Sequence, residues 1–183
     1  ALVEAFRRAH AVTPARHDEC KLTSIAGGNP LFLKELAARS QRAPYSTDGS
    51  LTLGRLIEQR CAKLSSRELR LLRIVSLLGP LATIPRLYGV LGLSSSTIAE
   101  DVESLERDGL LSLEELGVLS LHECWRDAIE SDTPPATRSA LAYDCANALR
   151  GAVESGAGFD VEWHQGRLYS MAGDAQAAIA CYR

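Results

Sequence analysis

Apolar residues recur every three or four positions along almost the whole chain, and most of them are leucine or alanine. This spacing places them on one face of a helix and predicts a mainly helical protein. Polar residues dominate 41–50, which we interpret as a flexible connector. The pattern predicts helices over 1–11, 14–26, 30–40, 51–63, 65–78, 83–91, 95–108, 122–131 and 136–154, and a helical pair over 160–183.

Residues that favour helix ends mark several of these boundaries. Ser65 is followed three positions later by Glu68, which predicts a capping box at the start of a strongly apolar helix. Glycines at 79, 92 and 109 each follow an apolar periodic stretch, which is typical of helix C-termini. Gly173 and Asp174 are expected to form the turn within the last helical pair.

The pattern changes after Gly109, where two short apolar runs flank the turn-forming sequence EELG at 114–117. This arrangement predicts a small β-hairpin between Leu110 and Leu121. Helices followed by a hairpin have the order of a winged helix, which is a variant of the helix-turn-helix. The sequence therefore predicts a winged helix in the middle of the chain.

Composition removes several classes of protein. The 183 residues are 46% apolar with a formal charge of −3, and neither value points to nucleic acid or an anionic membrane as a partner. Apolar runs stay well below the ~20 residues needed to cross a bilayer. Both ends look like the middle of a helix, and we interpret them as cut from a longer chain. The cysteines are odd in number and scattered, which favours free thiols in the cytoplasm: Cys20, Cys61, Cys124, Cys145 and Cys181.

Three motifs, in this order, carry a resemblance to a known family. The first is GGNPLFLKEL at 27–36, which contains a Gly-x-Pro at the start of a helix. The second is the stretch 65–121, with its serine-capped helix and later LERDGLL at 105–111. The third is LHECWRDA at 121–128, directly after the predicted hairpin. Their order along the chain is more specific than any one of them.

These motifs resemble the signal-transduction ATPases with numerous domains, which include large LuxR-type bacterial transcription regulators and are similar in plan to NB-ARC proteins. The resemblance implies that Pro30, after Gly28, packs near the adenine of a nucleotide. It also implies that His122 matches the histidine that contacts the β-phosphate of ADP. Two departures stand beside it, since Leu121 replaces Met and Glu123 replaces Asp. A plain helix start at Pro30 and a plain end of the hairpin at His122 remain the structural alternatives.

A fourth and weaker signal lies at the C-terminal end. Gly166, Tyr169, Gly173, Ala178 and Tyr182 are spaced as in a tetratricopeptide repeat, a helix–turn–helix unit. The fit is incomplete, because a tryptophan lies one place away from its usual position and a glutamine stands where leucine is usual. A single repeat buries its own face poorly, so we expect a longer array to follow.

The expected fold is mainly α, in four parts. We expect a lid-like helical subdomain at 1–50, a winged helix with one β-hairpin at 51–121, a helical linker at 122–158 and the first tetratricopeptide-like hairpin at 159–183. DNA reading is not expected of the winged helix, because the segment 94–109 would present Glu100, Asp101, Glu103, Glu106 and Asp108 against a single Arg107.

Catalysis is not expected of this segment. The sequence lacks G-x-x-x-x-G-K-[ST], the loop that cradles nucleotide phosphates, and it lacks a G-x-S-x-G nucleophile motif. His17 and Cys20 have helical i, i+3 spacing, but without a second pair we predict no metal site. His10 and His164 are interpreted as surface polarity or helix-face packing.

We therefore expect a non-catalytic regulatory segment of a cytoplasmic signalling ATPase, in which ADP or ATP bound to the parent protein controls a downstream domain. The resemblance implies that its partners are its own upstream P-loop domain and downstream repeats, with oligomerisation on activation and no contact with membrane or nucleic acid. The alternative is a helical adaptor that binds proteins without any dependence on nucleotide.

Overall fold

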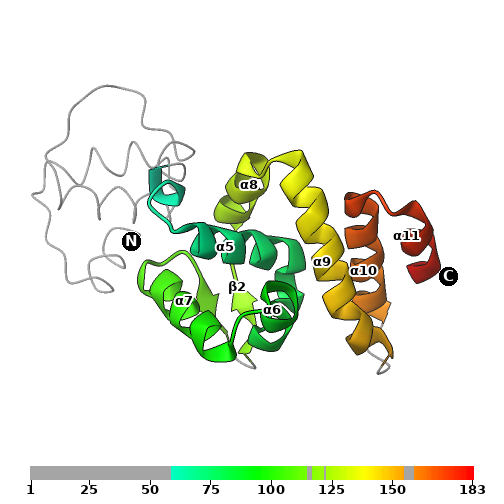
Figure 1. Ribbon diagram of the computed structural model, residues 1–183, viewed down its shortest axis with the longest axis horizontal. Coiled ribbons are helices and arrows are strands. Elements are labelled where there is room, and N and C mark those ends of the chain that lie inside the picture. The colour runs from blue at the N-terminus through cyan, green and yellow to red at the C-terminus, as the bar shows by residue number, and fades with distance from the viewer. Residues whose placement is uncertain (1–58, 115–116, 122, 155–158) are drawn as a thin grey trace, which may run out of the picture. The chain divides into compact units, whose positions relative to one another are not determined.

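The computed structural model describes residues 59–114, 117–121, 123–154 and 159–183. The chain divides into two compact units, 1–59 and 60–183, and all described residues except Gln59 belong to the second. The described part of this second unit is mainly helical, with one small two-stranded antiparallel sheet (Figure 1). The eight helices that lie wholly within it are α5 (Ser66–Leu78), the 3-10 helix η1 (Gly79–Leu81), α6 (Ile84–Leu91), α7 (Ser95–Arg107), α8 (Glu123–Asp132), α9 (Pro135–Glu154), α10 (Phe159–Ala172) and α11 (Ala175–Cys181).

The predicted helix boundaries of this unit are confirmed. Ser65 and Glu68 form both hydrogen bonds of a capping box, so two backbone N–H groups at the start of α5 are satisfied. Gly79 ends α5 at φ 53°, and Gly92 ends α6 in the left-handed region at φ 64°. Glycine adopts these angles without the steric cost of a Cβ. The helices predicted before residue 51, the one over 51–63 and the connector at 41–50 lie largely or wholly outside the described residues.

The predicted hairpin is also confirmed. Strands β1 (Ser112–Leu113) and β2 (Leu119–Ser120) pair antiparallel, with Ser112 opposite Ser120 and Leu113 opposite Leu119. A third segment adjoins β2, because Thr83 bridges Val118 and the N–H of Leu119 donates to the carbonyl of Ala82 at 2.8 Å. The residues between η1 and α6 therefore pair with the outer edge of β2, next to the two-stranded sheet.

The core of this unit forms around α5, which packs against α6, α8 and α9. The buried residues of α5 are leucine, isoleucine and valine with the one serine Ser76, and α8 adds Trp125 at 1% exposure. Burial of such side chains stabilises a fold by roughly 1.5–3 kcal/mol each before entropy is counted. The largest fully buried side chains are Leu71, Leu72, Ile74, Leu78, Leu87, Ile98, Leu105, Leu119, Trp125, Ile129 and Leu149.

Helices α9, α10 and α11 pack in sequence, each against the next (Figure 1). Gly173 at φ 84° makes the turn between α10 and α11, and Asp174 caps α11 by accepting from the N–H of Ala177 at 2.9 Å. The predicted turn at these two residues is thereby confirmed. Across the described residues, no helix combines the length and the apolar character needed to cross a membrane.

Candidate functional site

The predicted nucleotide-binding residues Gly28, Pro30 and His122 all lie outside the described residues. Their convergence on a nucleotide therefore stays a prediction. The structure does describe both sides of position 122. Leu121, which follows β2, is 3% exposed, and Trp125 in α8 is 1% exposed. The chain is thus held in the core on either side of this position.

An ion pair joins α5 to α7. Arg67 donates from Nη2 to Oδ1 of Asp101 at 2.6 Å, and its Nε lies 2.6 Å from Oδ2. Hydrogen bonding to the carboxylate raises the pKa of Arg67. Asp101 is only 4% exposed, which corrects the expectation that it belongs to the acidic surface of this helix. Its position between Ile98 and Leu105 places it on the buried face of α7.

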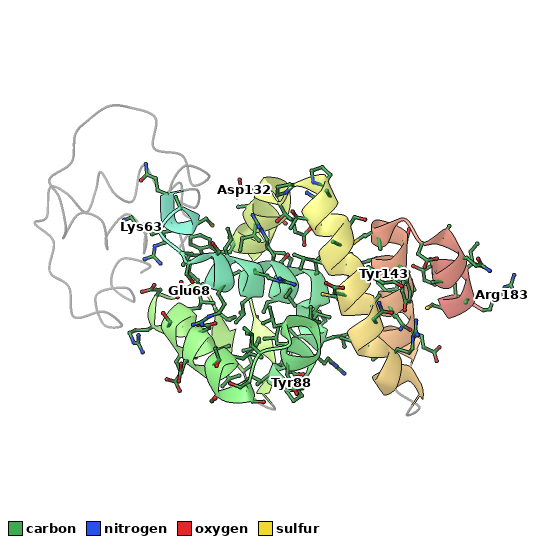
Figure 2. The ribbon with its side chains drawn as sticks, viewed as in Figure 1. Lys63, Glu68, Tyr88, Asp132, Tyr143 and Arg183 are labelled. Carbon is green, nitrogen blue, oxygen red and sulfur yellow. The ribbon has the colours of Figure 1, made fainter. Side chains whose placement is uncertain are left out.

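Glu68 strengthens the same contact, and Figure 2 shows it at the start of α5, beside α7. Its Oε2 accepts from the backbone N–H of Ser65 at 2.9 Å, and its Oε1 accepts from the hydroxyl of Ser104 in α7 at 3.1 Å. The hydrogen bonds from Ser65, followed by the one from Ser104, lower the pKa of Glu68. One carboxylate therefore caps α5 and holds α7 against it.

A polar corner fixes the turn from α8 into α9. The guanidinium of Arg138 donates from Nη2 to the carbonyl of Glu130 and to that of Thr133 at 3.2 Å. The hydroxyl of Thr133 donates to the carbonyl of Ile129. Carbonyls at the end of a helix lack intrahelical partners, so these donors satisfy them. A small cavity lies between this corner and α5, lined by Arg73, Ser76, Leu77, Glu130, Thr133 and Arg138.

Two buried polar side chains of α10 bind backbone carbonyls of other helices. His164, 9% exposed, donates from Nε2 to the carbonyl of Leu77 near the end of α5 at 2.9 Å. Gln165, 4% exposed, donates from Nε2 to the carbonyl of Ala146 in α9 at 2.9 Å. The sequence pattern predicted no specific contact for His164. Packing on a helix face was one of its two interpretations, but nothing in the neighbouring sequence indicated its acceptor.

Two buried thiols of this unit, Cys61 and Cys145, are poorly suited to nucleophilic chemistry. Burial raises the pKa of Cys145 to about 12 and also raises the pKa of Cys61. A thiol reacts as its thiolate, so a raised pKa lowers reactivity.

Within the described ranges, no group of three or more His, Cys, Asp or Glu side chains could hold a metal ion. The polar side chains described above form hydrogen bonds that join α5 to α7, α10 to α5 and α10 to α9.

No family model matches this chain, and neither does any curated protein or solved structure. The proposed function therefore rests on the motif resemblance in the sequence and on the contacts of the described residues.

Proposed function

We propose that this chain is a non-catalytic regulatory segment of a signal-transduction ATPase with numerous domains, similar to the large LuxR-type transcription regulators. In this proposal it couples the nucleotide state of its parent protein to a downstream repeat or output domain in the cytoplasm. The observation that carries the proposal is the order of the central elements, α5, α6, α7 and the β1–β2 hairpin, together with the acidic exposed face of α7.

The winged-helix interpretation rests on the order and pairing of five elements. Helix α5 is followed by the edge segment at 82–83, then by α6, α7 and the β1–β2 hairpin. The edge segment joins the hairpin through the bridge from Thr83 to Val118. Helices followed by a hairpin that is joined to the preceding helices in this way support the interpretation as a helix-turn-helix variant.

The exposed face of α7 argues against a role in DNA reading. In a winged helix this is the helix that would enter the major groove. Glu100, Glu103 and Glu106 are exposed there, with Arg107 as the one basic residue of the helix, and Glu114 is exposed in the hairpin. DNA affinity depends on neutralising phosphates with Lys and Arg, so this surface would repel the DNA backbone. Because Asp101 is buried, this face has one acidic residue fewer than the sequence predicted, but its net charge remains negative.

The tetratricopeptide-like interpretation of α10 and α11 is supported by one close approach. A Cβ built on Gly166 would lie 2.7 Å from ring atoms of Tyr182 and 3.1 Å from the Cβ of Cys181. Ala178, also part of the predicted spacing, is 5% exposed. Small residues at these positions let two antiparallel helices pack closely. We propose that this hairpin leads toward a downstream repeat array, which would be one partner of the segment.

The nucleotide enters this proposal through the resemblance. ADP, bound mainly by an upstream P-loop domain, would also contact Pro30 beside Gly28 and His122 after β2. Exchange of ADP for ATP would remove the contact with His122, and oligomerisation would follow activation. Trp125 and Leu121 would transmit a movement of position 122 into the core, because both are almost fully buried.

Calorimetric titration of ADP into the natural protein that contains this segment tests the proposal. The comparison is wild type against His122→Ala, with His17→Ala as the matched control. If His122 binds the nucleotide, its loss should weaken ADP binding by on the order of 1–3 kcal/mol, the cost of removing a buried hydrogen-bond partner. His17→Ala should bind as wild type. Equal binding by all three proteins would contradict the role of His122.

The alternative proposal is a helical adaptor that binds other proteins without nucleotide. Exposed aromatic residues favour it, since Tyr88, Tyr143, Trp163 and Tyr182 are each 45–53% exposed (Figure 2 labels Tyr88 and Tyr143). Aromatic residues are enriched in protein interfaces. The two proposals differ in one observable, because an adaptor should bind its partner equally with and without ADP.

A further inference from the structure

His164 occupies an unusual position for a histidine, since it joins two helices that are far apart in the sequence. It lies in α10, is 9% exposed, and donates from Nε2 to the carbonyl of Leu77 at 2.9 Å. The Cε1 atom lies 4.0 Å from the point where Gly79 would carry a Cβ. The imidazole therefore packs against the last turn of α5 and the glycine that ends it.

The acceptor determines which ring nitrogen carries the proton. A backbone carbonyl only accepts hydrogen bonds, so Nε2 must be protonated to donate to it. Neutral His164 then has a free electron pair on Nδ1. A second proton would go to Nδ1 and would place a full charge inside the contact between α10 and α5.

The charges around His164 oppose this second proton. Arg167 in α10 and Arg86 in α6 both act on the imidazole through their positive charge. Helix α5 contributes the carbonyl of Leu77, which favours the charged ring, but burial acts more strongly in the other direction. Desolvation first, and then the two arginines, lower the pKa of His164 below its ordinary value.

We propose that His164 is a pH-sensitive interlock, which in its neutral form holds α10 and α11 against the end of α5 and which loosens that contact when it is protonated. The proposal is independent of nucleotide binding. It rests on the buried hydrogen bond between the two helices, which holds the imidazole in the contact between α10 and the end of α5 with little access to water. Such an interlock would let the pH set how firmly the C-terminal helices are joined to the unit that contains the hairpin.

The direction of the pH effect follows from linkage. The pKa of His164 is lower in the docked form than in an undocked or unfolded form, where it is about 6.5. The contribution to docking is therefore complete above about pH 6.5 and decreases as the pH falls below that value. Opening of α10 should increase by up to about tenfold for each pH unit until the pKa of the docked form is reached.

Hydrogen exchange of α10 amides between pH 7.5 and 5.0, corrected for intrinsic exchange rates, tests the interlock. Three full-length proteins are compared: wild type, His164→Gln and the control His17→Gln. Glutamine keeps a donor at similar reach but does not titrate in this range. We expect protection of α10 to fall with acid in wild type and in His17→Gln, and to stay constant in His164→Gln. Identical pH profiles for all three proteins would overturn the proposal.

A second measurement keeps the proposal testable if His164→Gln does not fold. In ¹⁵N-labelled wild-type protein, the imidazole of His164 should show the tautomer with the proton on Nε2 at pH 7.5. The midpoint of its titration should lie below pH 6.5. The contact between α10 and α5 should be lost over the same pH range in which His164 is protonated. A midpoint at or above 6.5, or a proton on Nδ1, would contradict the interlock.

Discussion

Arg67 and Asp101 form a two-point ion pair between α5 and α7, with both nitrogen–oxygen distances at 2.6 Å. The two partners differ in environment, because the side chain of Arg67 is 51% exposed and that of Asp101 is 6% exposed. The carboxylate is therefore the partner that depends on the contact. Removing Arg67 would leave a negative charge buried against the core, whereas removing Asp101 would leave an arginine that water can reach.

Replacing Asp101 with alanine should destabilise this unit by about 1–3 kcal/mol, the range for losing hydrogen bonds to a charged group. The loss should stay below the 3–5 kcal/mol typical of a broken buried pair, because Arg67 regains water. Urea denaturation followed by circular dichroism measures the change. Glu103→Ala, on the exposed side of the same helix, is the matched control and should shift stability by no more than about 0.5 kcal/mol. Equal effects from both variants would refute the pairing.

The sequence predicted helix ends and the hairpin better than it predicted these contacts, for a physical reason. Caps such as Ser65 with Glu68, and turns such as Gly173, depend on residues within four positions, so local spacing reveals them. The partner of Asp101 is 34 residues away, and the partner of His164 is a backbone carbonyl 87 residues away. Periodicity places a residue on a face, but it does not identify what lies opposite.

The same limit applies to the candidate nucleotide site. Gly28, Pro30 and His122 were selected by resemblance of short motifs, since no periodic or charge pattern connects residues so far apart. Their contacts depend on how a loop and a helix start are placed in space. The polar contacts between α5, α7 and α10 were not predicted from the sequence. A single polar residue on an apolar helix face is common, so nothing distinguishes one that makes a specific contact.

Acid should weaken the start of α5 through Glu68. Its pKa is lowered in the folded protein by the hydrogen bonds from Ser65, so its contribution is complete above the unfolded value of about 4.3 and is lost as the pH falls through the folded value. Glu68→Gln should therefore lower stability at pH 7 and converge with wild type in strong acid. Urea midpoints from pH 7 to pH 3 measure this. Glu103→Gln should run parallel to wild type, and a constant gap for Glu68→Gln would exclude the mechanism.

Gly166→Ala should displace the ring of Tyr182 and weaken the packing of α11 on α10, because the new methyl would lie 2.7 Å from that ring and 3.1 Å from the Cβ of Cys181. A helical Gly→Ala exchange is otherwise favourable by up to about 1 kcal/mol, so the clash must outweigh this gain. In a Tyr182→Ala background, the same exchange should become less harmful, which a double-mutant cycle measures. Gly151→Ala in α9, where a Cβ meets nothing within 4 Å, should stabilise the protein. Additive effects of Gly166→Ala and Tyr182→Ala would contradict the close approach.

Thiol labelling should separate the cysteines by burial. Cys145 is fully buried in α9 with its pKa raised to about 12, whereas Cys181 in α11 is partly exposed. At pH 8 only about one Cys145 thiol in ten thousand would be ionised, and access would also require helix opening. In a Cys20→Ser, Cys124→Ser background, mass spectrometry after iodoacetamide pulses should find Cys181 modified first and Cys145 last, at least about tenfold more slowly. Denaturant should abolish the difference. Equal modification rates for Cys145 and Cys181 without denaturant would mean that α10 does not cover α9. They would contradict the packing of α10 through Gln165 on α9 and through His164 on α5.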